Sequence, residues 1–211
     1  MIIPAHVALL NEILAVPGFL ADPVLVFGYQ DVWPTEGRPE SKPEILRYSD
    51  LNEYLRAVKG LKTVHTMDHF DPRSEIRHDM NEPIPPGACE QYATLIDIGC
   101  LEHVFDTRMC LENCLRMVKV GGHYMMHAPI NGYYGHGLHT FHPEGLLSAL
   151  ELNGFEIIFH KFSTIDGIEI IDPEKHRDAL LWAVAKKIAP LGKFVSPQQG
   201  RWSTKYLDKM K

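Results

Sequence analysis

The sequence predicts an α/β protein built on a mostly parallel sheet, and three observations indicate this class. Segments with strand-like and helix-like patterns alternate along the chain, which is typical of βαβ units. The 211 residues are enough for one domain with a sizeable core. Hydrophobic residues make up 45% and charged residues 23% of the chain, which is an ordinary globular mixture.

Seven segments are predicted to be strands, because each is a short run rich in apolar residues and several end at Gly or Asp. They are residues 23–28, 62–68, 74–79, 92–99, 123–130, 155–162 and 179–187.

Helix start signals lie between these strands. Residues 1–16 have amphipathic spacing and are expected to cover an edge of the sheet. Ser41 with Glu44, and Asp50 with Glu53, match the capping-box pattern. Both pairs therefore predict a helix that begins just after the first residue of the pair.

Two further helices are predicted in the second half. Asp106 is placed to cap a helix over residues 107–118, and Gly121-Gly122 are expected to end it. Residues 144–153 have helical spacing after a proline and are followed by a glycine.

Charge and cysteine content limit the partners and the compartment. The net charge is −6 without a basic excess, so no nucleic-acid partner is indicated. No apolar run approaches the ~20 residues of a membrane span, and the N-terminus lacks the early Lys or Arg of a signal peptide. The four cysteines form no C-x-x-C pair. We therefore expect a cytoplasmic protein with reduced thiols and no membrane partner.

Chemistry is expected where the parallel strands end, because ligands of open α/β sheets bind beyond the carboxyl ends of the strands. Asp68 ends the second predicted strand and suits a vicinal diol, since a carboxylate accepts from both hydroxyls. Asp79 ends the third and can accept from an exocyclic amine. Together they indicate a nucleoside site, whereas the alternative is that both aspartates cap turns.

The sequence gives little support for a dinucleotide cofactor. The first strand ends at Gly28 and continues as Tyr29, Gln30 and Asp31, so the G-x-G-x-x-G fingerprint is absent.

The order of segments resembles the class I S-adenosylmethionine-dependent methyltransferases. The matching pieces are VLVFGYQD, TVHTMD, HDMNEP, YATLIDIGCLEHVFD, NCLRMVKVGGHYMMHAPI and HPEGLLSALELNGFEII, which together span roughly residues 20–165. The piece around LEHVFD is similar to the branch that includes ubiquinone O-methyltransferases. The resemblance implies a Rossmann-like fold with helices on both faces, in which the last two of seven strands form an antiparallel edge pair. It also implies that residues 1–190 form one S-adenosylmethionine-binding domain, with an N-terminal covering helix, followed by a polar tail over residues 191–211.

The resemblance assigns nine residues to the cofactor. They are Gly28, Tyr29, Gln30, Asp68, His69, Asp79, Met80, Gly99 and Cys100. Asp68 would hold the ribose hydroxyls, Asp79 the adenine amine, and Gly99 with Cys100 would line the sulfonium end. The family's glycine-rich first turn is reduced here to Gly28, so either Gln30 contacts the cofactor carboxylate or the chain is a degenerate, non-catalytic member.

Glu102 and His103 follow the fourth strand, where the methyl group would face the acceptor. His103 is suited to act as a general base. The pair could instead share a divalent metal ion, although Gly99 stands where related enzymes carry a further acid, so that site would lack a ligand. The third interpretation is purely structural, with Glu102 capping and His103 bonded to the backbone.

The loop over residues 131–142 is expected to overhang the same pocket. It supplies His136 and His139 as further base candidates, and its aromatic residues offer a wall for a sugar or a ring. His142 is assigned to the following helix cap. His127, inside a predicted strand, is interpreted as a core histidine with satisfied hydrogen bonds.

We therefore expect an S-adenosylmethionine-dependent O-methyltransferase that acts on a hydroxyl of a sugar or another small molecule. No resident metal is expected, and the polar tail is suited to a homodimer contact. The alternatives are a methyltransferase-like binding or scaffold protein without turnover, and a nicotinamide-dependent reductase.

Overall fold

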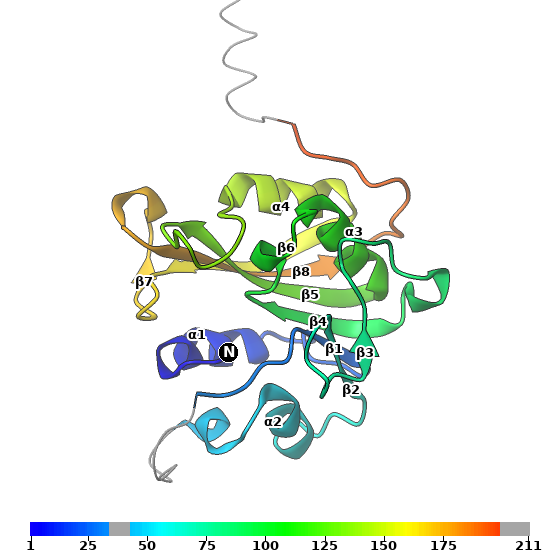
Figure 1. The fold of residues 1–211 in the computed structure, drawn as a ribbon, viewed down its shortest axis with the longest axis horizontal. Coiled ribbons are helices and arrows are strands. Elements are labelled where there is room, and N and C mark those ends of the chain that lie inside the picture. Colours follow the sequence, from blue (N-terminus) through cyan, green and yellow to red (C-terminus); the bar gives the residue numbers. More distant parts are fainter. Residues whose placement is uncertain (34–42, 199–211) are drawn as a thin grey trace, which may run out of the picture.

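The computed structural model describes residues 1–33 and 43–198, which form an eight-stranded sheet in the order β3-β2-β1-β4-β5-β8-β6-β7 (Figure 1). The strands β3, β2, β1, β4 and β5 are parallel, whereas β8, β6 and β7 pair antiparallel with their neighbours. The strand bounds are β1 Val24–Phe27, β2 Val64–Asp68, β3 Ile76–Arg77, β4 Tyr92–Ile98, β5 Val118–Asn131, β6 Phe155–Ser163, β7 Glu169–Ile170 and β8 Ala179–Lys187. The predicted fold class is thus confirmed, and the predicted count of seven strands misses only the two-residue strand β7.

Helices cover both faces of the sheet, as the resemblance to the methyltransferase family implied. Figure 1 shows α1 and α2 on one side and α3 and α4 on the other. The helix bounds are α1 Val7–Leu14, α2 Leu51–Ala57, α3 Thr107–Met117 and α4 Pro143–Leu152. Short 3-10 helices cover Pro4–His6, Glu44–Arg47, Pro86–Ala88, Leu101–His103 and Pro173–Lys175. The sheet therefore has two separate apolar cores, one on each face.

The N-terminal helix covers a face of the sheet, and the prediction that it covers an edge is wrong. The buried side of α1 packs in one core with side chains from β1, β4, β5 and β8, among them Met125 and Trp182. Burying the five aliphatic side chains of α1 against a central face contributes more than an edge contact, because the hydrophobic effect scales with the apolar area removed from water.

Local capping was predicted correctly at two helices. Asp50 accepts a hydrogen bond from the Glu53 backbone at 2.8 Å and begins α2. Asp106 does the same for Met109 at 2.8 Å and begins α3. Ser41 lies outside the described residues, and the segment after it forms only a 3-10 helix at Glu44–Arg47.

The glycine pair after α3 has a different role from the predicted one. The helix ends at Met117, and β5 begins at Val118 and runs through Gly121 and Gly122. A Cβ on Gly122 would lie 2.7 Å from the carbonyl oxygen of Ala93. Gly122 is therefore needed because the backbones of β4 and β5 approach closely there, next to an irregularity in their register.

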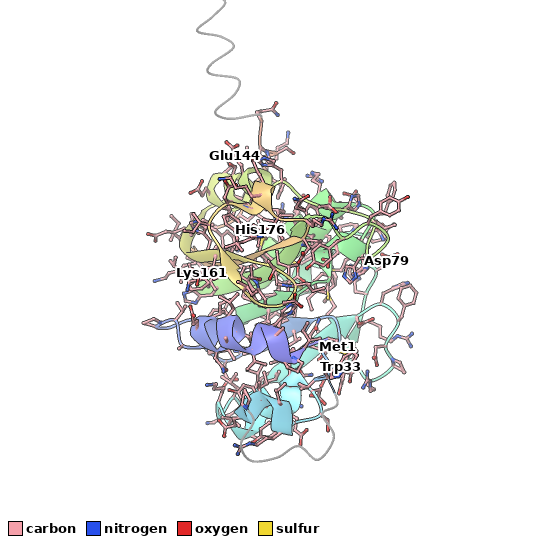
Figure 2. All side chains as sticks on the ribbon, turned by 90° about the vertical axis from the view of Figure 1, so that its left-hand side faces the viewer. Met1, Trp33, Asp79, Glu144, Lys161 and His176 are labelled. Carbon is pink, nitrogen blue, oxygen red and sulfur yellow. The ribbon has the colours of Figure 1, made fainter. Side chains whose placement is uncertain are left out.

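Both ends of the described chain pack onto the domain. The Trp33 amide donates to the Ile2 carbonyl at 2.8 Å, and Figure 2 shows Met1 beside Trp33. From the predicted tail, Phe194 is buried in the core and the Val195 amide donates to Asn153 at 2.8 Å. Residues 199–211 lie outside the described part. No helix within the described ranges has both the length and the apolarity needed to cross a bilayer.

Candidate functional site

The carboxylate of Asp68 stands at the end of β2, beside the turn that follows β1. Its Oδ2 accepts from the Tyr29 amide at 3.1 Å, and its Oδ1 accepts from the amides of Phe70 and Asp71 at 2.8 and 3.0 Å. Burial opposes ionisation, but the bonds from Asp71, Phe70 and Tyr29 outweigh it and lower the pKa of Asp68. An ionised oxygen with one protein donor keeps a lone pair for a ligand hydroxyl.

The end of β3 carries the predicted adenine contacts. Asp79 is partly exposed, and its Oδ1 accepts from the backbone and side-chain nitrogens of Asn81 at 2.9 and 2.7 Å. Met80 is buried in the core, whereas His69 is exposed and its ring lies 4.3 Å from that of Phe70. Asp79 thus forms a turn of the kind favoured by aspartate, in which Oδ1 accepts both bonds from Asn81.

The turn after β1 is packed tightly around Gly28. Gly28 has a φ of +75°, and a Cβ there would collide with the sulfur of Cys100. The Cys100 thiol donates to the carbonyl of Phe27 at 2.9 Å. The side chain of Gln30 is buried and its Oε1 accepts from the Met1 nitrogen at 2.8 Å. The side chains of Cys100 and Gln30 are thus bonded within the protein.

Tyr29 and Arg73 join the loops that follow β1 and β2. The Tyr29 hydroxyl donates to Asp50 at 3.0 Å, and the guanidinium of Arg73 lies 3.8 Å from the centre of the Tyr29 ring. Arg73 also bonds Asp31 at 2.9 Å and Asp71 at 2.6 Å. Arg73 was not predicted as a site residue. Its contacts with Tyr29 and Asp31 depend on the parallel pairing of β1 with β2, which brings the loops after these two strands together.

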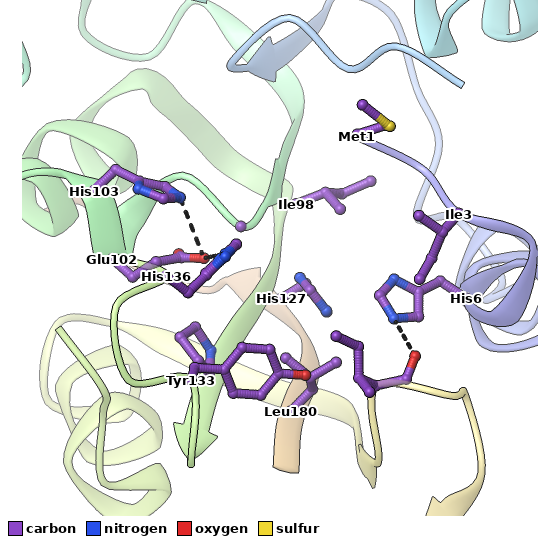
Figure 3. A pocket seen from close by; sticks show the side chains of 13 residues that line it. Met1, Ile3, His6, Ile98, Glu102, His103, His127, Tyr133, His136 and Leu180 are labelled. Carbon is purple, nitrogen blue, oxygen red and sulfur yellow. Dashed lines mark hydrogen bonds and ion pairs between the residues drawn. The ribbon is translucent and has the colours of Figure 1, made fainter. Parts of the chain in front are cut away.

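Glu102 is the centre of a second group of side chains beyond β4. It lies in the 3-10 helix Leu101–His103, its side chain is 1% exposed, and Oε1 is 3.9 Å from His103 Nε2 and 3.7 Å from His136 Nε2 (Figure 3). A Cβ on Gly137 would lie 2.9 Å from Glu102 Cγ, so this glycine lets the loop after β5 close over the carboxylate. The structure thereby brings together three of the four predicted catalytic residues.

The protonation of this group is set by burial. Burial and the nearby Asp97 raise the pKa of Glu102 to about 8, and burial raises the pKa of Asp97 to about 7. Burial, assisted by His136, lowers the pKa of His103. Near neutral pH the Glu102 carboxyl is therefore mostly protonated and the His103 ring is mostly neutral.

The same group has the composition of a metal site. Glu102, His103 and His136 each offer one ligand atom, and these atoms all lie within 4.8 Å of one another. Two imidazoles and a carboxylate suit divalent transition metals. Gly99 leaves this group without the acid that was expected to be missing, and His136 from the loop after β5 offers a third ligand atom instead, so the absence of a resident metal stays a prediction.

The remaining histidines of the loop have other contacts. The Nε2 of His139 lies 3.1 Å from the Phe105 carbonyl, and its ring stacks on Phe141 at 6.0 Å between centroids. His142 occupies the N-cap position of α4 without a side-chain hydrogen bond to the helix. Neither lines the cavity beside Glu102.

That cavity has a volume of about 270 Å³ and lies between the ends of β4 and β5 and the N-terminal segment (Figure 3). It is lined by Met1, Ile3, His6, Ile98, Gly99, Glu102, His103, His127, Pro129, Tyr133, His136, Ile165 and Leu180. His127 is buried, but neither of its ring nitrogens has a hydrogen-bond partner, so the interpretation as a satisfied core histidine is wrong. The sequence held no signal that His6 and His127 would lie together.

Comparison with known proteins identifies the fold of the chain. No family model and no curated protein matches the sequence. Among solved structures, a protein of Listeria monocytogenes described as an S-adenosylmethionine-dependent methyltransferase is 13% identical, with a TM-score of 0.57, over 87% of this chain and 96% of that one. A protein of Bacillus halodurans described as a methyltransferase is 14% identical, with a TM-score of 0.53, over 87% and 99%.

A third similar structure is the complex between the Haloferax volcanii Trm112 methyltransferase activator and a protein described as a methyltransferase. It is 13% identical, with a TM-score of 0.55, over 86% of this chain and 89% of that one. The mostly parallel sheet with its antiparallel edge matches the Rossmann-like fold of these neighbours. The chain therefore has the fold of the class I S-adenosylmethionine-dependent methyltransferases, as the sequence predicted.

Proposed function

We propose that the protein transfers the methyl group of S-adenosylmethionine to a hydroxyl oxygen of a small molecule. The observation that carries the proposal is that two groups of side chains, which form the first and the second half of the site, lie along one edge of the sheet. An ionised Asp68 stands beside the β1 turn, and a buried acid with two histidines borders a cavity beyond β4.

The residues of the first half fit the cofactor in charge and position. Asp68 would accept from the ribose hydroxyls, Asp79 from the adenine amine, and Met80 would pack near the ring. Cys100 adjoins both Gly28 and Asp97, so it would border the reactive end. The cofactor supplies an electrophilic methyl group on a sulfonium, and the protein must supply alignment and a dry site.

The second half supplies a proton acceptor. As the new carbon–oxygen bond forms and the carbon–sulfur bond breaks, the hydroxyl proton must leave. Glu102, once ionised, can take this proton inside the cavity. His103 and His136 are about half exposed and lie within 4 Å of Glu102, so they can pass the proton to solvent.

Calorimetric titration with S-adenosylhomocysteine tests the cofactor, with NAD(H) as the control ligand. Binding of the first alone is expected. Asp68→Ala should weaken it roughly ten- to a hundredfold, since a diol loses an ionised acceptor. The exposed Asp172, which pairs with Lys175, provides the matched control Asp172→Ala, which should bind as the wild type does. An unchanged affinity in Asp68→Ala would mean that the site is misplaced.

One observation favours a second candidate, a binding or scaffold protein without turnover. Tyr29, Gln30 and Cys100 all make internal bonds in the turn where the family has glycines, and Arg73 stacks above them. The same titration separates the two, because a scaffold of this kind would bind neither S-adenosylhomocysteine nor NAD(H).

A further inference from the structure

Buried polar atoms without a partner gather in one place. Among the described residues, five buried side-chain atoms lack a hydrogen-bond partner, and four of them belong to residues that line the cavity beside Glu102. These four are Glu102 Oε2, both ring nitrogens of His127 and the Tyr133 hydroxyl. Buried polar groups are normally hydrogen-bonded, so such a gathering is expected where a ligand completes the bonds.

Two of these groups face each other across a glycine. Gly99 directly follows β4 with a φ of +73°, and a Cβ on it would lie 3.1 Å from Glu102 Oε1 and 3.5 Å from His127 Nδ1. The absent side chain leaves the space over Gly99 open to both the carboxyl and the imidazole. A polar atom placed over Gly99 would therefore be within reach of both.

Two polar groups of the cavity, His127 and Tyr133, are uncharged. Burial, assisted by His6, holds the pKa of His127 well below its usual value, and the ring packs 4.2 Å from that of Trp182. Burial, assisted by Asp178, raises the pKa of Tyr133. His127 is thus a neutral ring with one donor and one acceptor, and Tyr133 keeps its proton.

Apolar residues form much of the remaining wall, which also carries the side chains of His6, His103 and His136. The apolar residues include Ile3, Ile98, Pro129, Ile165 and Leu180, and none of the thirteen described residues that line the cavity is Lys or Arg. An apolar cavity of about 150 Å³ holds benzene. The larger volume here, about 270 Å³, leaves room for one substituted ring or a small fused pair.

Resting on the proposed function, we propose that the methyl acceptor is an uncharged, mostly apolar ring compound that carries a hydroxyl, and that His127 and Tyr133 orient it. His127 would bond the reacting hydroxyl across Gly99 from Glu102. The Tyr133 hydroxyl would contact a second polar group, and the aliphatic wall would hold the body of the ring.

This proposal narrows the expected acceptor and argues against a sugar. A sugar presents a hydroxyl on nearly every carbon, and each one buried against isoleucine or leucine without a partner costs about 1–3 kcal/mol. A phosphorylated compound would bury its charge with no Lys or Arg side chain on the wall to pair with it.

Ligand-observed NMR titration in the presence of S-adenosylhomocysteine tests the proposal with four probes. They are para-ethylphenol, para-ethylanisole, methyl glucoside and para-ethylphenyl phosphate. We expect para-ethylphenol to bind most tightly, with its methyl ether weaker because the ether cannot donate a hydrogen bond. His127→Phe keeps the ring volume and should weaken para-ethylphenol about tenfold. His160→Phe, on the exposed part of β6, is the matched control and should leave this affinity unchanged.

Three results would overturn the inference. They are no binding of para-ethylphenol up to its solubility limit, tighter binding of the glucoside or the phosphate, and an unchanged affinity in a folded His127→Phe variant. The titration also separates this inference from the proposed function. If para-ethylphenol binds in a His127-dependent way but S-adenosylhomocysteine does not bind, the cavity is a ligand site and the proposed methyl transfer is wrong. If S-adenosylhomocysteine binds but para-ethylphenol does not, the proposed methyl transfer is retained and the proposed acceptor class is wrong.

Discussion

Replacing Glu102 by glutamine should change how the stability of the protein depends on pH. Below about pH 4.5 the carboxyl is protonated in both the folded and the unfolded chain, so it adds no pH dependence. As the pH rises from there towards the raised pKa of about 8, the unfolded chain releases this proton first, and the folded state loses stability. Above about pH 8 the loss is complete. Glutamine cannot ionise, so the variant escapes the loss.

The size of the effect follows from the two pKa values. The interval between 4.5 and about 8 corresponds to an upper limit of roughly 5 kcal/mol. Between pH 5 and pH 8, the free energy of unfolding of the wild type should fall relative to that of Glu102→Gln by about 2–4 kcal/mol. The side chain is 1% exposed, so solvent screening removes little of this difference.

Urea unfolding of both proteins at pH 5, 6, 7, 8 and 9 measures the difference directly. Glu151→Gln, on the exposed part of α4, is the matched control and should follow the wild type throughout. Parallel stability curves for the wild type and Glu102→Gln over this range would refute the reasoning. They would mean that the Glu102 carboxyl is as easily ionised in the folded chain as in the unfolded one.

Further predictions concern activity, the metal question and backbone geometry. With an accepted substrate, the methylation rate of the wild type should rise with pH towards a plateau above about pH 8, and Glu102→Gln should lose this rise whereas His139→Ala keeps it. Because Glu102 is assigned to proton transfer, dialysis against a chelator should leave the methylation rate unchanged. A loss of rate that a divalent ion restores would mean that Glu102, His103 and His136 bind a metal ion instead. Gly99→Ala forces a side chain into a left-handed backbone and into the gap beside Glu102, so thermal or urea unfolding should show a loss of about 1–2 kcal/mol and acceptor binding should fall. Asp106→Ala removes the cap of α3 and should cost about 1 kcal/mol, while Asp172→Ala should cost less than half as much.

The parts of the fold that depend on local chemistry were predictable. Asp50 and Asp106 cap helices through bonds to residues three positions later, which the sequence shows directly. Gly121-Gly122 was misinterpreted, because a glycine pair after a helix can end the helix or allow two strands to approach closely. Only the proximity of Ala93, nearly thirty positions earlier, decides between them.

The candidate site, like the fold, could be predicted only in part. Asp68 and Asp79 could be singled out because they stand at or just beyond strand ends, and parallel strands place their carboxyl ends along one edge of the sheet; their role in binding the cofactor stays a prediction. The choice between His136 and His139 was not available from the sequence. The Leu138 and His139 amides both donate to the carbonyl of Glu102, and this docking directs His136 inward while His139 bonds to Phe105.

The chemistry of the cavity depends on which long-range contacts exclude water from it. His6 arrives from the N-terminal segment, where its Nε2 lies 3.1 Å from the Ile165 carbonyl, and its ring is 5.2 Å from that of His127. This contact joins the N-terminal segment to the loop between β6 and β7 and closes the cavity on the side opposite Glu102 (Figure 3). A solvated Glu102 would keep an ordinary pKa and be ionised throughout the neutral range. The loop after β5, which packs on Glu102 at Gly137, and the contact between His6 and Ile165 both bring in segments far from Glu102 in the sequence, so the raised pKa of Glu102 could not be predicted from its neighbours in the chain.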